Sequence, residues 1–241
     1  MISVVVPCYN EEKNIHGLVV RFADIAGKLS AECFELVLVD NGSSDGTSAA
    51  IDTEIQNFGF IKKVSVTENK GYGFGVLEGL KACGGEWLGW IHADLQLPPE
   101  AFLEFDRIIK ENQDKARNIF FKGRRRNRPF SDAFFTIGMG IFESLYFGAR
   151  LWDIYAQPTL LHRNLYEKIS SPPYDFSLDL YMYLLARKSG MTVRRVPVVQ
   201  QKREEGKSSW NNGKLRARMN FVKNTIVSSI RIKSAFGSNE K

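Results

Sequence analysis

The 241-residue chain lacks any run of about 18 or more apolar residues, so its sequence predicts no transmembrane helix. Cysteine is scarce: Cys8, Cys33 and Cys83 are odd in number and widely spaced, which matches neither a disulfide framework nor a zinc site. We interpret them as ordinary small side chains in a reducing cytoplasm. The opening residues, MISVVVP, carry neither a charged segment nor a small-residue cleavage site, so we expect no secretory leader. Internal repeats and low-complexity tracts are also lacking.

Positive charge is in excess, and it is unevenly distributed. The net charge is +6, of which residues 202–241 carry +7, with ten Lys or Arg against three Asp or Glu, so the first 201 residues carry −1. A second basic cluster, KGRRRNR at 122–128, has five positive charges in seven residues. Such clusters indicate an anionic partner, namely phosphate, a membrane surface or nucleic acid, unless they are ordinary surface charge.

Apolar, β-branched runs alternate with helical patterns along the first half of the chain. Strands are predicted at residues 2–7, 34–40, 63–67, 86–92, 118–123 and 191–199. Helical spacing recurs between them, and further helices are predicted at 130–152 and 180–190. This alternation favours an α/β fold with a doubly wound, mostly parallel sheet flanked by helices. We expect one domain in two halves, 1–125 and 126–205, followed by a C-terminal segment, 206–241.

The C-terminal segment predicts a basic amphipathic helix that begins at Leu215. Its apolar stripe consists of Leu215, Met219, Val222, Ile226 and Ile230, which we expect to face away from Arg216, Lys223 and Lys233. A helix of this kind lies on an anionic membrane or docks on its own domain, and both interpretations stay open.

Polar and glycine-rich clusters follow the first four predicted strands. They are PCYNEE, DNGSSDGT, ENKGYGFG and HADLQ, in that order. Ligands of open parallel sheets bind beyond the carboxyl ends of the strands. We therefore expect the four clusters to converge on one binding site.

The chemistry of these clusters suits a phosphorylated, sugar-containing ligand. Asp40 ends a strand and can accept hydrogen bonds from a ribose or a base edge, and Lys70 beside glycines can approach a phosphate. A dinucleotide fingerprint is excluded, because Val76 and Glu78 stand where it requires glycine. Asp94 and Gln96 can together hold a hard divalent cation on a diphosphate, whose oxygens complete the coordination. Alternatively, Asp94 only caps the following helix.

In order and spacing, VVVPCYNEEKNI, VLVDNGSSDGT, NKGYGFGVLEGL and HADLQLPP resemble family 2 glycosyltransferases of the GT-A fold. The subgroup that they resemble most is the dolichyl- and polyprenyl-phosphate sugar synthases, whose fourth motif commonly reads D-A-D-L-Q-x-P-P. The resemblance covers roughly residues 1–125. Farther on, RRVPVVQQKREEGKSSW is similar to the ending of that family.

The resemblance implies a role for each matching residue. The nucleotide would be bound by Pro7, Tyr9, Asn10, Glu11, Asp40, Lys70 and Gly71. Asp94 and Gln96 would hold Mg²⁺ or Mn²⁺ on the donor diphosphate, which makes Asp94 a catalytic residue. The phosphate or acceptor side would use Arg124 in the basic cluster, with Arg203 and Ser208 in the ending.

Two positions depart from the family's pattern. His92 stands where the family has the first acid of D-A-D, and a neutral imidazole can ligate Mn²⁺, contact the sugar or a phosphate, or be purely structural. Asp153 stands where the family has an acid, but the following IYAQPTLL lacks the usual glycine and Phe-Arg pair. Asp153 is the candidate catalytic base if the acceptor is a hydroxyl.

These resemblances imply an inverting glycosyltransferase of cell-envelope glycan synthesis. It would move a sugar from a UDP- or GDP-linked donor to a polyprenyl phosphate, acting peripherally at the cytoplasmic face of the membrane. Two alternatives are transfer to a glycan or protein hydroxyl, and a catalytically inactive nucleotide-sugar binder. A membrane-protein partner or a homo-oligomer stays open. We expect no nucleic-acid partner, because no recognisable nucleic-acid motif accompanies the basic segments.

Overall fold

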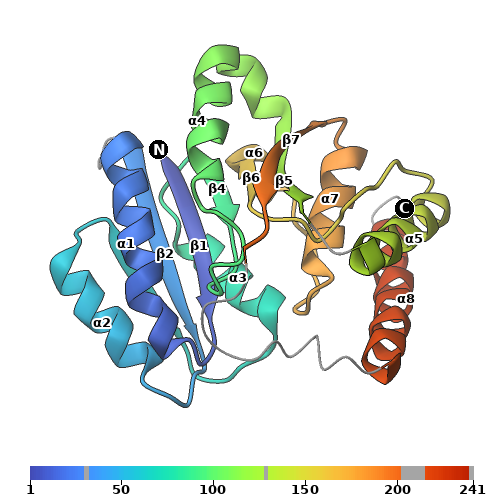
Figure 1. Ribbon diagram of the computed structural model, residues 1–241. Coiled ribbons are helices and arrows are strands. Elements are labelled where there is room, and N and C mark those ends of the chain that lie inside the picture. The colour runs from blue at the N-terminus through green and yellow to red at the C-terminus, as the bar shows by residue number, and fades with distance from the viewer. Residues whose placement is uncertain (30–32, 128–129, 202–214, 239–241) are drawn as a thin grey trace.

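The computed structural model of the chain describes residues 1–29, 33–127, 130–201 and 215–238. A central sheet carries helices on both faces (Figure 1). The strands are β1 Ile2–Cys8, β2 Phe34–Asn41, β3 Ile61–Val66, β4 Trp87–Trp90, β5 Ile119–Arg126, β6 Thr159–His162 and β7 Thr192–Val199. The helices are α1 Glu12–Leu29, α2 Thr47–Asn57, α3 Tyr72–Ala82, α4 Ala101–Asn112, α5 Phe130–Phe147, α6 Arg163–Tyr166, α7 Leu178–Lys188 and α8 Leu215–Ser238, with a 3₁₀ turn at Gln113–Asn118.

The sheet has the strand order β3-β2-β1-β4-β6-β5-β7. Its strands are parallel except β6, which pairs antiparallel with both β4 and β5. The six strands predicted from the sequence are confirmed, and β6 was missed. It has only four residues, TLLH, and a run so short and uniformly buried has no periodicity to reveal it.

Two apolar clusters hold the layers together. In β1, Val4 and Val6 pack on the face covered by α1 and α4, and Val5 packs on the face covered by α3 and α7. Strands buried on both faces need apolar residues at every position, and this is why β1 and β2 are nearly continuous runs of Val and Leu. Because β1 to β4 are parallel to one another, their carboxyl ends all lie at one edge of the sheet.

Helices α5 and α8 lie together at one end of the molecule, beyond α7 (Figure 1). They are joined by a hydrogen bond in which the Ser229 hydroxyl donates to Glu143 Oε1 at 2.7 Å. Within the described ranges, no helix combines the length and the apolar character needed to cross a membrane.

Candidate functional site

The loop after β1 is fixed to the loop after β2 by hydrogen bonds. The Asn10 N–H donates to Ser43 Oγ at 3.2 Å, and the Ser44 N–H donates to Asn10 Oδ1 at 2.8 Å. The Glu11 N–H donates to Thr47 Oγ1 at 2.8 Å. Asn10 has a φ of +56°, a left-handed conformation that asparagine tolerates better than most residues. The local sequence thus builds one rigid wall from two loops.

Asp40 lies in this wall with its carboxylate almost buried. It pairs with Cys8 across β1 and β2, and its Oδ1 accepts a hydrogen bond from the Ser43 N–H at 3.0 Å. The ring of Tyr9 is exposed, and Pro7 is half-buried.

Burial, together with the charges of Glu11 and Asp40, raises the pKa of the Cys8 thiol well above its usual range. Cys8 is therefore not a nucleophile at neutral pH.

The loop after β3 joins the wall through Gly71. The Asn41 amide donates to the Gly71 carbonyl oxygen at 3.1 Å. Gly71 has a φ of +117°, and a Cβ there would meet the Tyr174 carbonyl oxygen at 2.5 Å, so only glycine fits. Lys70 extends over the ring of Phe74 and borders a pocket of about 450 Å³ formed with residues 171–177 and α8.

The loop after β4 completes the convergence. The ring of His92 lies 4.9 Å from that of Tyr72, at the start of α3, and 6.1 Å from that of Phe176. Asp94 Oδ1 accepts a hydrogen bond from the Gln96 N–H at 3.1 Å, and both residues are half-buried. The four clusters predicted to meet at one edge do meet there.

A divalent metal would find few protein ligands at this edge. Among the residues that the structure describes, no three His, Cys, Asp or Glu side chains gather as a metal site. Asp94 offers carboxylate oxygens and Gln96 an amide oxygen, the hard donors that Mg²⁺ and Mn²⁺ accept. This donor set fits a cation whose remaining ligands come from a diphosphate and water.

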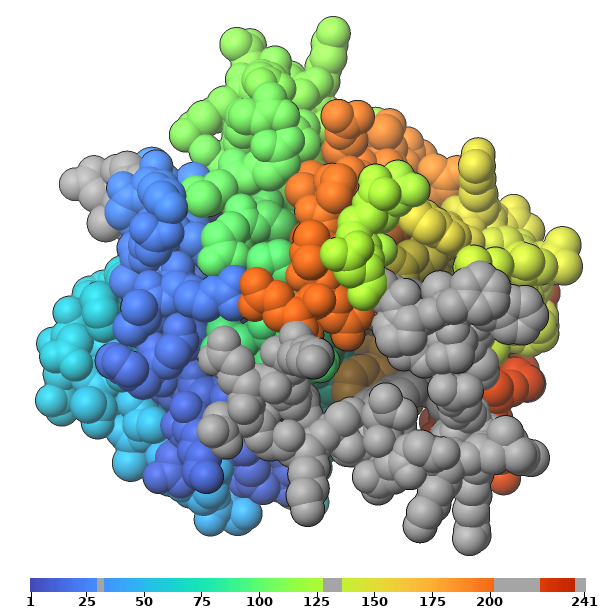
Figure 2. Space-filling view, viewed as in Figure 1, coloured from blue at the N-terminus to red at the C-terminus, as the bar shows by residue number. Residues whose placement is uncertain are grey.

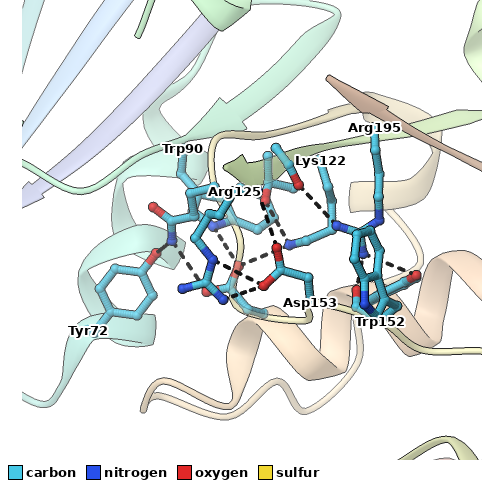
Figure 3. Close-up of polar contacts among 12 residues, drawn as sticks. Tyr72, Trp90, Lys122, Arg125, Trp152, Asp153 and Arg195 are labelled. Atoms are coloured by element: carbon cyan, nitrogen blue, oxygen red, sulfur yellow. Dashed lines mark hydrogen bonds and ion pairs between the residues drawn. The ribbon is translucent and has the colours of Figure 1, made fainter. Parts of the chain in front are cut away.

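A buried polar network lies beneath the loops after β3 and β4 (Figure 3). The Trp90 indole N–H donates to Asp179 Oδ1 at 3.2 Å, and the Gln157 amide donates to Asp179 Oδ2 at 3.3 Å and also to the Tyr72 hydroxyl. Lys122 Nζ lies 3.7 Å from Asp179 Oδ1. These contacts join five segments that are distant in sequence, so the network positions the loops above it.

Lys122 is the least expected member of this network. Its side chain is fully buried, and its Nζ donates to Thr159 Oγ1 at 3.1 Å. Burial lowers the pKa of Lys122 to about 8, opposed by the attraction of Asp179. The sequence places Lys122 at the start of a basic cluster that we expected to face an anionic partner; instead, its charge serves the core.

Two arginines of the cluster, Arg124 and Arg125, lie beside Trp152 and Asp153. The Arg125 Nε donates to Asp153 Oδ1 at 3.1 Å, with a second guanidinium contact to the same oxygen (Figure 3). The guanidinium groups of Arg124 and Arg195 lie 5.3 and 5.0 Å from the Trp152 ring centroid. Figure 2 shows parts of β5 (yellow-green) and β7 (orange) side by side, and these are the two strands that carry the arginines. Arg124 is exposed here, as a phosphate ligand requires.

Two of the predicted site residues, Arg203 and Ser208, lie outside the described residues. Conversely, Tyr72, Gln157, Asp179 and Arg195 had no part in the sequence-based prediction. Tyr72 stands inside the NKGYGFG cluster and was overlooked there. Arg195 stands in RRVPVVQQKREEGKSSW, the segment similar to the ending of the family, but no role was assigned to it there. Gln157 and Asp179 lie in segments without a recognisable motif, so only the fold brings them to the site.

The family model described as "Glycosyl transferase family 2" matches residues 3–169. An undecaprenyl-phosphate 4-deoxy-4-formamido-L-arabinose transferase of Proteus mirabilis is 33% identical over 132 residues, which cover 54% of this chain and 38% of that protein. A dolichol-phosphate mannosyltransferase of Pyrococcus furiosus is 33% identical over 131 residues, which cover 54% of this chain and 36% of that protein. The matched segments thus span little more than a third of these relatives.

Solved structures share the fold at lower sequence identity. A mannosyltransferase from Pyrobaculum calidifontis, in complex with GDP-Man and Mn²⁺, has a TM-score of 0.62 at 21% identity over 85% of this chain and 58% of that chain. A glucosyl-3-phosphoglycerate synthase from Mycobacterium tuberculosis, with Mn²⁺, UDP-Glc and phosphoglyceric acid, has a TM-score of 0.65 at 18% identity over 95% and 79%. At this distance the likeness shows the fold, which is the GT-A type.

Proposed function

Since the chain belongs to glycosyl transferase family 2, we propose that it moves a sugar from a nucleotide-diphosphate sugar to a polyprenyl phosphate, with inversion at the anomeric carbon. The observation that carries the proposal is the convergence of four loops beside the carboxylate of Asp94, which is suited to a metal–diphosphate. The acceptor is proposed from the two relatives, which are named for undecaprenyl phosphate and dolichol phosphate.

The donor is proposed to lie along the wall made by the first three loops. The exposed ring of Tyr9 offers a face on which a base can stack, framed by Pro7, Asn10 and Glu11. Asp40 would accept hydrogen bonds from the base or ribose, since only one of its oxygens has a bond to Ser43. The glycine at 71 and the neighbouring Lys70 would lie by the nucleotide. A UDP- and a GDP-linked donor both suit this wall.

Asp94 and Gln96 would hold Mg²⁺ or Mn²⁺, which when bound neutralises charge on the leaving diphosphate. His92 is proposed as a third contact to the metal or the sugar. Its ring packs beside Tyr72, so its position is fixed by aromatic contacts. The protein's own contribution is to hold donor and acceptor in line and to exclude water.

The acceptor phosphate is proposed to bind at Arg124 and Arg195, whose guanidinium groups both lie over the Trp152 ring. A phosphate oxygen attacks the anomeric carbon, the bond from that carbon to the diphosphate oxygen breaks, and the nucleoside diphosphate leaves with the bonding electrons. An anionic phosphate carries no proton that must first be removed. The step therefore needs no general base.

The placement of Asp153 supports a phosphate acceptor over a hydroxyl. A base must have a free lone pair aimed at the acceptor, but the Asp153 carboxylate is buried and accepts hydrogen bonds from Arg125. We propose that Asp153 positions Arg125 beside the acceptor site. If the acceptor is a hydroxyl instead, Asp153→Asn abolishes turnover while donor affinity is unchanged.

Thermal stabilisation by nucleotides tests the donor site. UDP, GDP and dTDP are each added with and without Mn²⁺, and a ligand at about 100 times its Kd adds about 2.7 kcal/mol to stability. One nucleotide that stabilises the chain only with Mn²⁺ supports the proposal, and no stabilisation by any nucleotide contradicts it. Donor binding without turnover would identify an inactive nucleotide-sugar binder.

The enzyme is proposed to work at the cytoplasmic face of the membrane, where polyprenyl phosphates and nucleotide sugars would meet.

A further inference from the structure

Helix α8 is docked on the domain by its polar side. Among the described side chains of α8, those of Thr225, Ser228 and Ser229 are buried, and Ile232 is the one large apolar side chain buried with them. The half-buried ring of Phe236 also stacks on Tyr181. On a surface helix of a soluble protein the apolar stripe normally faces the core. In α8 the arrangement is inverted, because the buried stripe is largely hydroxylated.

The apolar residues of α8 face outward instead. Ile226, Val227 and Ile230 are exposed, Ile230 by 55% of its surface. Ile226 and Ile230 belong to the stripe predicted from the sequence, so this part of the predicted stripe faces outward, while Val222 is half-buried. The side chains of Leu215 and Met219 lie outside the described residues. Contrary to our expectation, Lys223 shares the outward side with them.

Helix α5 repeats the inversion. Ile137, Ile141 and Leu145 recur every four residues and so share one face, and they are exposed by 48%, 57% and 80%. The buried face carries Glu143, whose Oε2 finds no hydrogen-bond donor among the residues that the structure describes. Two neighbouring helices therefore bury polar groups and expose apolar ones.

The two helices form one unit at the same end of the molecule (Figure 1). Besides the bond between Ser229 and Glu143, the Lys233 ammonium donates to the Tyr146 carbonyl oxygen at 3.0 Å and lies over the Tyr146 ring. We call the exposed side chains of α5 and α8 the apolar–basic face; it comprises Ile137, Ile141, Leu145, Lys223, Ile226, Val227, Ile230, Arg231 and Lys233.

The charges of the apolar–basic face are all positive. Lys223, Arg231 and Lys233 are exposed, and α8 contains no Asp or Glu along its whole length. The one carboxylate among the described side chains of α5, that of Glu143, is buried. Pairing this face with its copy in a symmetric dimer would bring cations against cations, which disfavours self-association.

We propose that the apolar–basic face docks on an anionic lipid bilayer, with the isoleucine and leucine side chains in the acyl boundary and the basic ones at the headgroups. Helices that lie in a membrane interface combine an apolar face with Lys and Arg in this way. The docking itself is independent of catalysis. Its use, bringing the acceptor site near a lipid phosphate, rests on the proposed function.

The structure connects this face to the acceptor site. The Ser144 hydroxyl of α5 accepts a hydrogen bond from the Leu151 N–H at 3.0 Å and donates one to the Leu151 carbonyl oxygen at 2.8 Å. Trp152 is the next residue in the chain, and the guanidinium groups of Arg124 and Arg195 lie over its ring. A bilayer on α5 would therefore lie close to the arginines proposed for the acceptor phosphate.

Vesicle flotation tests the proposal. The chain is mixed with vesicles of phosphatidylglycerol and phosphatidylcholine, or of phosphatidylcholine alone, at moderate salt. We expect the chain to float with the anionic vesicles. The triple variant Leu145→Ser/Ile226→Ser/Ile230→Ser should bind at least tenfold more weakly, and so should Lys223→Glu/Arg231→Glu. These side chains are exposed, so the variants should fold, which circular dichroism checks.

Val20→Ser is the matched control, because Val20 is an equally exposed apolar residue on α1, away from this face. It should float like the unmodified chain. Recovery of the unmodified chain in the unbound fraction, or equal binding by the triple variant, overturns the proposal. The proposal is also overturned if light scattering shows a dimer for the unmodified chain and a monomer for the triple variant, and the unmodified chain does not bind vesicles.

Transfer to detergent-dispersed polyprenyl phosphate separates this proposal from the proposed function. The triple variant should keep the unmodified rate in detergent and lose it on vesicles. If the unmodified chain floats but transfers nothing in either medium, the proposed function fails and the docking stands. If it transfers in detergent but never floats, the docking fails alone.

Discussion

Removing the buried charge of Lys122 should destabilise the whole fold. Lys122 Nζ and Asp179 Oδ1 are 3.7 Å apart, and both side chains are almost completely inaccessible to water. Lys122→Met leaves the Asp179 carboxylate with only the neutral donors of Trp90 and Gln157. An uncompensated buried charge costs about 3–5 kcal/mol, so we expect a loss of that size in the free energy of unfolding.

A double variant separates the pair from its surroundings. Asp179→Asn alone should also destabilise, but Lys122→Met/Asp179→Asn removes both charges of this pair and should cost less than the sum of the single variants by about 1–3 kcal/mol. The penalty also depends on pH. Because the pKa of Lys122 falls to about 8 on folding, the folded chain binds fewer protons than the unfolded chain above pH 8. The contribution of Lys122 to the free energy of unfolding therefore rises with pH in this range. Asp179→Asn should therefore be less harmful at pH 9.5 than at pH 7.

Urea unfolding at pH 7 measures these changes, with the m value as the check on two-state behaviour. Lys110→Met is the control, because Lys110 is exposed in α4 and its ion pair, with Asp106 in the preceding turn, lies at the surface. It should change stability by less than about 0.5 kcal/mol. A Lys122→Met variant within about 1 kcal/mol of the unmodified chain, or strict additivity in the double variant, would refute the reasoning.

Three further changes are expected. Burial raises the pKa of Glu143 to about 7, so its contribution to stability is favourable when the carboxyl is protonated and is lost as pH rises through 7. Glu143→Gln should raise the free energy of unfolding by about 1–2 kcal/mol at pH 8.5 and leave it nearly unchanged at pH 5, which urea unfolding measures. Gly71→Ala should cost about 1–3 kcal/mol and weaken nucleotide binding, whereas Gly59→Ala, in open space, should be neutral in thermal melts. Asp94→Asn should abolish Mn²⁺-dependent stabilisation by the preferred nucleotide without lowering the midpoint of the free chain; retained dependence on Mn²⁺ would show that the ligand lies elsewhere.

The sheet and the converging loops could be predicted because they depend on local signals. β1 and β2 are nearly continuous apolar runs, and each is followed by a cluster of polar residues. Parallel pairing then determines where those turns meet. The glycine at 71 could be predicted as part of a motif, and the structure supplies the reason, a close approach by the Tyr174 backbone.

The second half could be predicted less well, because its features depend on contacts between distant segments. Lys122 lies opposite Thr159 of β6, a strand that the sequence did not reveal, and near Asp179 of α7. Nothing in KGRRRNR distinguishes that lysine from Arg124, which is exposed two residues later. In α8 the stripe of isoleucines was predicted, but only the fold shows that Ser and Thr take the buried side.

The most direct test is an assay of sugar transfer to undecaprenyl phosphate, in detergent with Mn²⁺, from UDP- and GDP-linked donors that carry a radiolabelled sugar. The assay measures the radiolabel that appears in the lipid fraction. We predict label in undecaprenyl phosphate with one donor class, none with undecaprenol, and loss of transfer in Asp94→Asn. Label that enters undecaprenol but not its phosphate would contradict the proposed acceptor. Absence of transfer from every donor, despite metal-dependent nucleotide binding, would contradict the proposed catalysis.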